Sequence, residues 1–392
     1  MSDTQKVDQP TAPAARAATP TAAPATSRTR TLVRVVLGVA LLLVLLAFPL
    51  YVDATWLRVG EFVMVSAVAA IGLTLLTGHC GQLSLGTPFF MLVGATAYAT
   101  LASDPVAESG LVALGWPPLL ALLGAIVVSG LAGLAFAPVA GRVGGIYLSV
   151  ATLALVYLGL YLGQRFSELT GGAATGRPSP AFEVLGFSFT TAQPEFLLLG
   201  VPLNAPERTW YLFLVFTAIA FLLATGAVRS RPGRAWRAVR DNPASATAMG
   251  VDVARTRAGA FVVSSAYAGL AGVMTIQWFG LLKADENEFD GSWSITVAIG
   301  LLAMIIIGGL GSITGAVVGA AFVSGFPLAL NVLVPQVGFL QDLTTGDGGF
   351  TPVVLTAYAY GALIVLLVIF EPGGLAAIAR RLTHRFTRVT TR

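Results

Sequence analysis

The residues best able to do chemistry in this chain lie in one polar stretch, RPGRAWRAVRDNPASATAMG at positions 231–250, between two long apolar runs. Three of its arginines recur at every third position, while Trp236 and Val239 fall on the opposite side. This pattern is typical of a short amphipathic helix that lies in a membrane interface. The arginines are Arg234, Arg237 and Arg240. A cationic face of this kind contacts anionic headgroups.

The second half of this stretch predicts a very short helix that is capped at both ends. Asn242 is a good N-cap, and Pro243 suits the first helical position, where its missing N–H costs nothing. Gly250 suits a left-handed C-terminal cap. A helix this short is marginal in water, so something must pack on it. The small side chains of residues 244–249 allow a close fit into a groove on another protein; the alternative is that the segment only lies along the headgroups.

The rest of the chain offers little catalytic or metal chemistry. A phosphate-binding P-loop needs a lysine directly after a glycine, and neither Lys6 nor Lys283 meets that condition. His79 and Cys80 are adjacent, but the sequence provides too few companions for a metal site. No arrangement of nucleophile, base and orienting acid indicates an enzyme. We therefore expect no catalytic residue, no metal and no cofactor in this chain.

The elements that position this stretch are membrane helices. Of 392 residues, 56% are hydrophobic and 11% are charged, and the mean hydropathy of +0.81 places the chain in a bilayer. Apolar runs of about 20 residues recur, enough to cross roughly 30 Å of hydrocarbon as helices. The expected fold is all-α, a polytopic transmembrane helical bundle of about ten spans. These spans are 35–52, 59–76, 84–102, 116–137, 144–163, 209–228, 258–280, 293–308, 314–334 and 352–370.

Ionisable side chains are nearly absent from these spans, which argues against an ion-driven pump. Glu61 is the main exception. It lies near the outer end of its span beside Trp56 and Arg58, where we expect its carboxylate to reach interfacial water. Transport without an internal energy source remains, either as a passive pore or as a subunit that a partner drives.

The distribution of basic residues predicts that both termini are cytoplasmic, because short cytoplasmic loops collect Lys and Arg. With ten spans, fifteen basic residues close to the spans fall inside: Arg28, Arg30, Arg34, Arg142, Arg229, Arg231, Arg234, Arg237, Arg240, Arg255, Arg257, Arg380, Arg381, Arg385 and Arg388. Five fall outside: Arg58, Arg165, Arg177, Arg208 and Lys283. The net charge of +4 follows from this topology and from contact with membrane lipid, not from binding to nucleic acid.

The chain divides into three parts. Residues 1–30 form a cytoplasmic N-terminal tail, whose first 27 residues are rich in Ala, Pro and Thr and are expected to be disordered. Residues 31–377 form the transmembrane domain, with a long cytoplasmic loop at 229–257. Residues 378–392 form a basic cytoplasmic C-terminal tail.

Two junctions on the inner side are alike in composition: GHCGQLSLG at 78–86 and GGLGSITG at 308–315. Both carry glycines and hydroxyls at the ends of spans, as expected where broken helices offer polar groups to a solute. Close packing of helices through small residues is the alternative explanation. Candidate pathway residues are Gly81, Gln82, Ser84, Gly86, Gly309, Gly311, Ser312 and Thr314.

Several segments in order resemble the branched-chain amino acid permeases of ABC transporters, specifically the LivM type. Ala244, Ser245, Ala246, three residues and Gly250 are similar to the EAA-type element that couples such permeases to their ATPases, although Ala244 stands where glutamate is common. The lead-in GRAWRAVRDN also resembles the family. The other segments are TGHCGQLSLGTPFF, GGIYLSVATLAL, TGG, IGGLGSITGAVVGA and FEPGGL, and the likeness covers about residues 55–377.

This resemblance implies a permease subunit of the plasma or inner membrane that imports branched-chain amino acids. Its implied partners are two P-loop ATPase subunits that bind the ATP, a homologous second permease and an extracytoplasmic solute-binding protein. The implied coupling residues are Arg237, Arg240, Asp241, Pro243, Ala244, Ser245, Ala246 and Gly250. Three alternatives remain open: a related permease for urea or short amides, a self-sufficient solute channel, and a structural or assembly subunit.

Overall fold

A computed structural model of the chain describes residues 26–105, 110–143, 145–184, 186–190, 197–198, 201–202, 204–284, 293–333 and positions 354, 358, 361, 362, 365, 374 and 375. The chain has two compact units, Met1–Val44 and Leu45–Arg392. The first contains most of α1 (Thr26–Ala47), which begins inside the predicted tail at 1–30. Three predicted segments lie outside the described residues. They are the remainder of that tail, the tail at 378–392, and the span at 352–370 except for five helical positions.

The second unit is built from helices with a few very short strands. Its long helices are α2 (Ala54–Leu73), α3 (Thr87–Ala102), α4 (Pro118–Arg142), α5 (Ile146–Arg165), α8 (Ala205–Arg229), α11 (Val253–Phe279) and α12 (Ile295–Gly308). The shorter helices are α6 (Ser167–Thr170), α7 (Gly172–Thr175), α9 (Arg231–Asp241), α10 (Pro243–Ala248), α13 (Ile313–Ala320), α14 (Phe326–Leu333) and the 3₁₀-helix η1 (Phe48–Leu50). Two π-helical segments, η2 (Thr74–His79) and η3 (Ala321–Gly325), continue α2 and α13.

Six helices of the described residues are long and apolar enough to cross a membrane: Ala54–His79, Pro118–Arg142, Ile146–Arg165, Ala205–Arg229, Val253–Phe279 and Ile313–Leu333. They correspond to six of the predicted spans. Three shorter apolar helices, Gly38–Leu50, Thr87–Ala102 and Ile295–Gly308, correspond to three more. The protein is therefore a polytopic bundle of α-helices.

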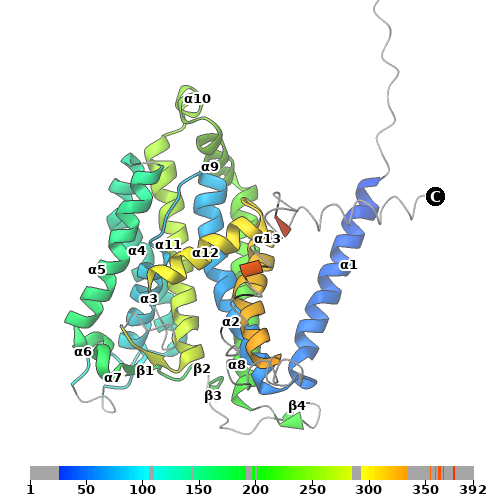
Figure 1. Cartoon of the computed structure of the whole chain (residues 1–392), viewed down its shortest axis with the longest axis vertical. Helices are drawn as coiled ribbons and strands as arrows, with labels where there is room; N and C mark the ends of the chain where they lie inside the picture. Colours follow the sequence, from blue (N-terminus) through cyan, green and yellow to red (C-terminus); the bar gives the residue numbers. More distant parts are fainter. Residues whose placement is uncertain are drawn as a thin grey trace, which may run out of the picture. The chain divides into compact units, whose positions relative to one another are not determined.

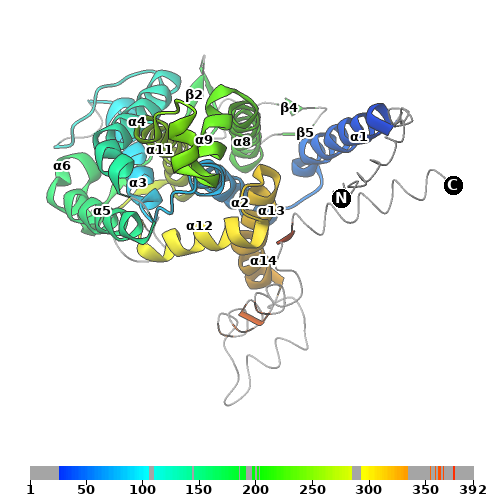
Figure 2. The same ribbon diagram turned by 90° about the horizontal axis from the view of Figure 1, so that it is seen from above.

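The predicted span at 293–308 differs most from a membrane crossing. Its helix, α12, has 14 residues and is therefore about 21 Å long, shorter than the hydrocarbon core of a bilayer. Figure 1 shows α12 running obliquely across the neighbouring α2, and Figure 2 shows the same helix from above. After α12 the chain reverses direction and enters α13.

The interior of the second unit is held together by close approaches of small residues. A β-carbon at Gly94 of α3 would collide with the backbone of Gly269 in α11, and one at Gly272 would collide with the Met91 carbonyl. Ser129 of α4 is fully buried, and its Oγ lies 3.0 Å from the Phe90 carbonyl oxygen and 2.7 Å from that of Ser265. Small residues and hydroxyls are what helix association in lipid rewards, so α3, α4 and α11 form a tight trio.

The strands are short and form three two-stranded antiparallel sheets. In the first, β1 (Arg177–Pro178) pairs with β6 (Leu281–Leu282), which joins the segment after α7 to the end of α11. The second is a hairpin of β2 (Glu183–Val184) and β3 (Phe187–Ser188), and the third pairs β4 (Leu197–Leu198) with β5 (Val201–Pro202).

Two arginines near these strands are buried. Arg177 donates from Nη1 to the Leu169 carbonyl oxygen at 3.1 Å. Arg208 donates to the Ser188 carbonyl at 3.2 Å and lies 4.8 Å from the centre of the Phe187 ring. Arg177 thereby ties β1 to α6, and Arg208 ties α8 to β3; both strands lie at the end of the unit opposite α10 (Figure 1).

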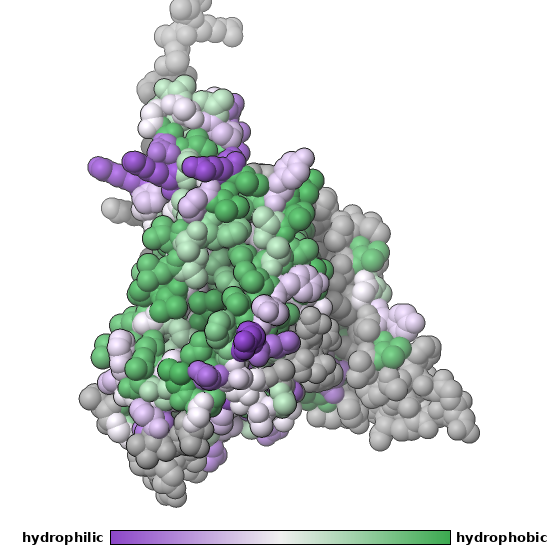
Figure 3. Space-filling model, turned by 90° about the vertical axis from the view of Figure 1, so that its left-hand side faces the viewer, coloured by the Kyte–Doolittle hydropathy of each residue, from purple (hydrophilic) through white to green (hydrophobic). Residues whose placement is uncertain are grey.

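The outward faces of several helices are apolar and exposed. Examples are Leu120 and Leu131 of α4, Tyr161 of α5, and Leu222 and Leu223 of α8, each more than half exposed. Figure 3 shows one side of the molecule, where a hydrophobic band separates hydrophilic surface at its two ends. Such a band is expected of a surface that contacts lipid.

Candidate coupling and transport site

The arginine-rich stretch folds as predicted into the amphipathic helix α9. Gly233, Trp236 and Val239 are buried on one face. A β-carbon at Gly233 would collide with the Ala227 and Val228 carbonyls of α8, so this glycine lets α9 fold closely against the end of α8. The spacing of three and three places the arginines on the remaining faces.

The predicted double cap of α10 is confirmed. The Asn242 side chain accepts a hydrogen bond from the Ser245 N–H at 3.1 Å, and Pro243 occupies the first turn. At the other end, Gly250 has φ +82°, which favours glycine. The Gly250 N–H donates to the Thr247 carbonyl and the Val251 N–H donates to the Ala246 carbonyl. This is the Schellman pattern, which satisfies carbonyls that a helix end would otherwise leave unpaired.

The short helix α10 stands at one end of the second unit, beyond α9 (Figure 1). Ala246 is its one buried residue, and Ala244, Ser245 and Gly250 are exposed. Met249 directly after the helix is 71% exposed, a large apolar side chain among small ones. The sequence prediction did not single out Met249, although it is the one large side chain in a run of small residues. A flexible methionine on a projecting surface is typical of protein contacts that must adapt.

The charged residues around α9 and α10 have different surroundings. Asp241, Arg237 and Arg240 are all exposed, and Arg237 donates from Nε to the Gly233 carbonyl of its own helix at 3.3 Å. Arg240 instead donates from Nη1 to the Gly78 carbonyl, 162 positions away in the sequence. After α10, Asp252 caps α11 by accepting from the Arg255 N–H at 3.0 Å.

The first predicted pathway segment, 81–86, is held by neighbouring helices. Gln82 is buried, and its Nε2 donates to the Ala140 carbonyl at 2.6 Å, in the last turn of α4. The Ser149 hydroxyl of α5 donates to the Leu83 carbonyl at 3.2 Å, and the Leu85 N–H donates to Thr152 Oγ1 at 2.9 Å.

Two more of the candidate pathway residues in this segment are also closely surrounded. Ser84 accepts from the Gly86 N–H at 3.3 Å and, with Thr87 and Ser264, surrounds an internal space too small for a water molecule. A β-carbon at Gly86 would lie 3.2 Å from Thr152 Cβ, and Gly81 has φ +74°. Ser84 and Gly86 are therefore buried, whereas Gly81 is exposed.

The second predicted segment, 308–315, closes on itself. Gly309 and Gly311 have positive φ angles of +108° and +79°, which turn the chain from α12 into α13. Ser312 is the N-cap of α13, where its hydroxyl accepts from the Gly315 N–H at 3.0 Å and lies 3.1 Å from the exposed Thr314 hydroxyl. A β-carbon at Gly308 would collide with the Gly315 carbonyl, so the two arms of this turn touch.

The structure brings the two glycine-rich junctions together. A β-carbon at Gly78 would lie 2.6 Å from the Gly311 nitrogen and 2.8 Å from its Cα. Gly374, in the closing segment, approaches from the other side, since its β-carbon would lie 2.8 Å from the Gly309 nitrogen. The two junctions thus meet at the backbone contact between Gly78 and Gly311. That they line the pathway stays a prediction.

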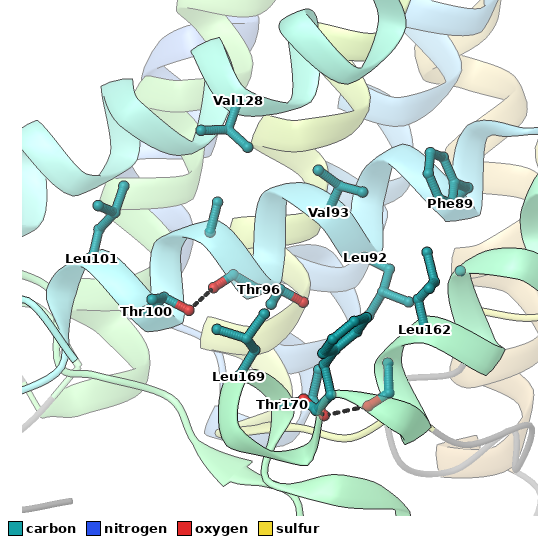
Figure 4. Close-up of a pocket in the computed structure, with 14 residues that line it drawn as sticks. Phe89, Leu92, Val93, Thr96, Thr100, Leu101, Val128, Leu162, Leu169 and Thr170 are labelled. Carbon is teal, nitrogen blue, oxygen red and sulfur yellow. Dashed lines mark hydrogen bonds between the residues drawn. The ribbon is translucent and has the colours of Figure 1, made fainter. Parts of the chain in front are cut away.

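A separate cavity of about 450 Å³ lies between α3, α4, α5 and α6 (Figure 4). Its lining is almost wholly apolar, and it contains none of the predicted pathway residues. The threonines in it turn their hydroxyls to backbone carbonyls: Thr100 Oγ1 donates to the Thr96 carbonyl at 2.8 Å, and Thr170 Oγ1 to that of Gly163 at 2.5 Å. An amino acid, which is a zwitterion, needs polar partners that this cavity lacks.

Glu61 contradicts the prediction that its carboxylate reaches water. Its side chain in α2 is only 3% exposed, and Oε1 has no hydrogen-bond partner among the described residues. The adjacent residue, Gly60, lies against the Trp210 ring of α8, so this part of α2 is packed against a neighbouring helix. Sequence reasoning could not foresee which helix would cover this face. Among the described residues no group of three or more His, Cys, Asp or Glu could hold a metal ion.

The fold and this site define a polytopic helical membrane protein that presents a capped helix at one end, above a contact between two helix breaks. Residues 57–370 match the family described as branched-chain amino acid transport system / permease component, and the chain belongs to this family. The expected family is confirmed, and the protein is a membrane permease.

Curated relatives agree with this assignment. The high-affinity branched-chain amino acid transport system permease protein LivM of Salmonella typhimurium is 26% identical over 350 residues, which cover 87% of this chain and 74% of the relative. LivM of Escherichia coli is 25% identical over 351 residues, covering 87% and 75%. LivH of Salmonella typhimurium is 34% identical over 106 residues, covering 27% and 32%. No solved structure matches the chain.

Proposed function

We propose that this chain is the membrane-spanning subunit of an ABC importer for branched-chain amino acids, driven by separate ATPase subunits that dock on α10. The observation that carries the proposal is the doubly capped α10, which projects from the end of the bundle with Ala246 buried and its other side chains exposed. Caps at both ends keep a helix of six residues folded without burial of its outer face. That outer face remains free to enter a groove on another protein.

The proposed topology has ten spans with both termini cytoplasmic. The six long apolar helices, the three shorter ones and the predicted span at 352–370 supply the ten; local thinning of the bilayer accommodates α12, which is shorter than the hydrocarbon core. The orientation is supported by the basic residues of α9, which lie at the same end of the second unit as α10 (Figure 1). Because short loops rich in Arg stay in the cytoplasm, α10 faces the compartment that contains ATP.

The proposed partners are two P-loop ATPase subunits, which bind the ATP, a homologous second permease and an extracytoplasmic solute-binding protein. The relatives named LivM and LivH are both described as permease proteins of a branched-chain amino acid transport system. The interior trio of α3, α4 and α11 is too closely packed to admit an amino acid. A pathway at the face shared with the second permease is consistent with that packing.

Docking on α10 is tested by charge insertion at its exposed surface. Ser245→Glu, and separately Met249→Glu, should abolish co-purification of the ATPase subunits while leaving the amount of this chain in the membrane unchanged. The matched control is Ala174→Glu, an exposed alanine on the short helix α7 at the opposite end of the unit. Normal ATPase recovery with both charged variants would contradict docking on α10.

Reconstitution separates the remaining alternatives. The complete complex in proteoliposomes with ATP should take up leucine, isoleucine and valine, and the purified chain alone should pass none of them. Flux through the chain alone would support a self-sufficient channel. Uptake of urea or a short amide in preference to leucine would support the related amide permeases, and the absence of any flux with full assembly would support a structural subunit.

A further inference from the structure

Arg240 lies where the docking element meets the membrane bundle. It is in the last turn of α9, two residues before Asn242, whose side chain caps α10. The buried Trp236 and Val239 anchor the same turn of α9 in the bundle. A displacement of α10 therefore reaches Arg240 through a short, hydrogen-bonded stretch of backbone.

The side chain of Arg240 extends from α9 to both helix breaks. Nη1 donates a hydrogen bond to the carbonyl of Gly78, in the last turn of the π-helical segment η2. Along its stem, Cγ lies 3.1 Å from the position that a β-carbon on Gly81 would occupy. At its tip, Nη1 lies 3.3 Å from the position that a β-carbon on Gly311 would occupy.

Three glycines leave room for this side chain. Gly78 and Gly311 touch through their backbones, and Gly81 forms the wall on the other side of the arginine. The Gly78 carbonyl lies at a helix end, where no backbone donor of the same helix follows in regular register. A guanidinium is a strong donor to such a carbonyl and carries its charge at every physiological pH.

The other arginines of α9 do not make this connection. Arg234 donates to the Arg229 carbonyl at 3.2 Å, and Arg237 donates to the Gly233 and Val228 carbonyls at 3.3 and 3.5 Å. These bonds stay within α8 and α9. Arg240 alone of the three joins α9 to a segment of η2.

We propose that Arg240 is a positioning residue that transmits movement of α10 to the paired glycine junctions at 78–86 and 308–315, and so couples ATPase action to the opening of the pathway. This inference rests on the proposed docking of ATPase subunits on α10. Through one guanidinium, a shift of α9 moves the end of η2 and the turn between α12 and α13 together.

The test uses the complete complex in proteoliposomes with radiolabelled leucine as the probe. Arg240→Gln should keep ATPase co-purification and ATP hydrolysis near wild type, while leucine taken up per ATP hydrolysed falls about tenfold. Arg240→Lys, which keeps the charge and one donor, should be intermediate. Arg234→Gln is the matched control and should leave the ratio unchanged, because its bond to the Arg229 carbonyl is local.

A second measurement does not depend on transport. Cys80, the chain's one cysteine, is 2% exposed and adjoins Gly81, and burial raises the pKa of its thiol to about 11. Maleimide labelling of this chain, read by mass spectrometry, should speed up during ATP turnover in the wild-type complex and stay slow in the Arg240→Gln complex.

Three outcomes would overturn the inference. They are an unchanged uptake per ATP in Arg240→Gln, an equal rise of Cys80 labelling in both complexes, and loss of ATPase binding in Arg240→Gln, which would make the residue part of the docking surface. Failure of the proposed function looks different, since the ATPase subunits would then not co-purify with the wild-type chain.

Discussion

The two glycine-rich junctions have similar sequences and different structures. In the first, 81–86, the polar groups bond to other helices: Gln82 to α4, and the backbone of Leu83 and Leu85 to hydroxyls of α5. In the second, 308–315, the polar groups bond locally, with Ser312 capping the helix that it begins. The first junction is held by hydrogen bonds to other helices, and we call it the clamp. The second is held by hydrogen bonds within itself, and we call it the self-contained turn.

This difference shows that similar residues can serve different purposes at the two sides of one contact. The clamp ties the end of α2 to α4 and α5, whereas the turn between α12 and α13 is attached mainly through glycine backbones at Gly78 and Gly311. A self-contained turn can shift as a unit, because its own hydrogen bonds travel with it. We therefore expect the second junction to shift as one unit, whereas a shift of the first must deform its hydrogen bonds to α4 and α5.

The largest effect is expected from bulk inside the turn. Gly308→Val places side-chain carbons against the Gly315 carbonyl, which should destabilise the protein by about 3 kcal/mol or more and deplete it from the membrane. The measurement is membrane yield together with the unfolding temperature in detergent. Gly300→Val in the same helix is the control, since nothing lies within 4 Å of its β-carbon position. Equal loss for both variants would mean that the close approach at Gly308 is unimportant.

A smaller effect is expected at the clamp. Gln82→Leu leaves the Ala140 carbonyl, in the last turn of α4, without its donor, at a cost of about 1–3 kcal/mol. The unfolding temperature should fall accordingly. Gln164→Leu is the control, because that glutamine is exposed and its bond to the Ala284 carbonyl is 3.4 Å long. If the unfolding temperature falls no more for Gln82→Leu than for Gln164→Leu, the first junction does not depend on its bond to α4.

The smallest effect is expected at the turn's own cap. Ser312→Ala should cost about 1 kcal/mol, and Ser312→Asp, another good N-cap, should restore most of it. Thr314→Ala should change the stability by less than about 0.5 kcal/mol, because its hydroxyl is exposed. Leucine uptake by the Ser312→Ala complex should remain close to wild type if the hydroxyl only caps the helix. A loss of uptake with unchanged stability would instead place Ser312 in the pathway.

Short-range sequence patterns were sufficient to predict much of the secondary structure of this molecule. Runs of apolar residues located the membrane helices, and the cap of α10 was predicted because Asn242, Pro243 and Gly250 act on backbone within a few residues of themselves. The amphipathic α9 followed from its spacing alone.

Contacts between distant residues could not be predicted in this way. Arg240 and Gly78 are 162 positions apart, and Gln82 and Ala140 are 58 apart. Their meeting depends on how whole helices pack, which no short pattern encodes. The burial of Glu61 was missed for the same reason, since it depends on how α2 packs among its neighbours. The oblique course of α12 likewise depends on its neighbours.

The hydroxyl of Ser129 has a consequence for synthesis of the chain. It joins α4 to Ser265 of α11, which the ribosome reaches 136 residues later. At about 5–20 residues per second, α4 waits roughly 7–27 s for this neighbour. During that interval the small-residue faces of α3 and α4 must tolerate whatever surrounds a nascent membrane helix. A bulky substitution on these faces therefore affects the packing of the complete bundle and also the state of α3 and α4 before α11 has been synthesised.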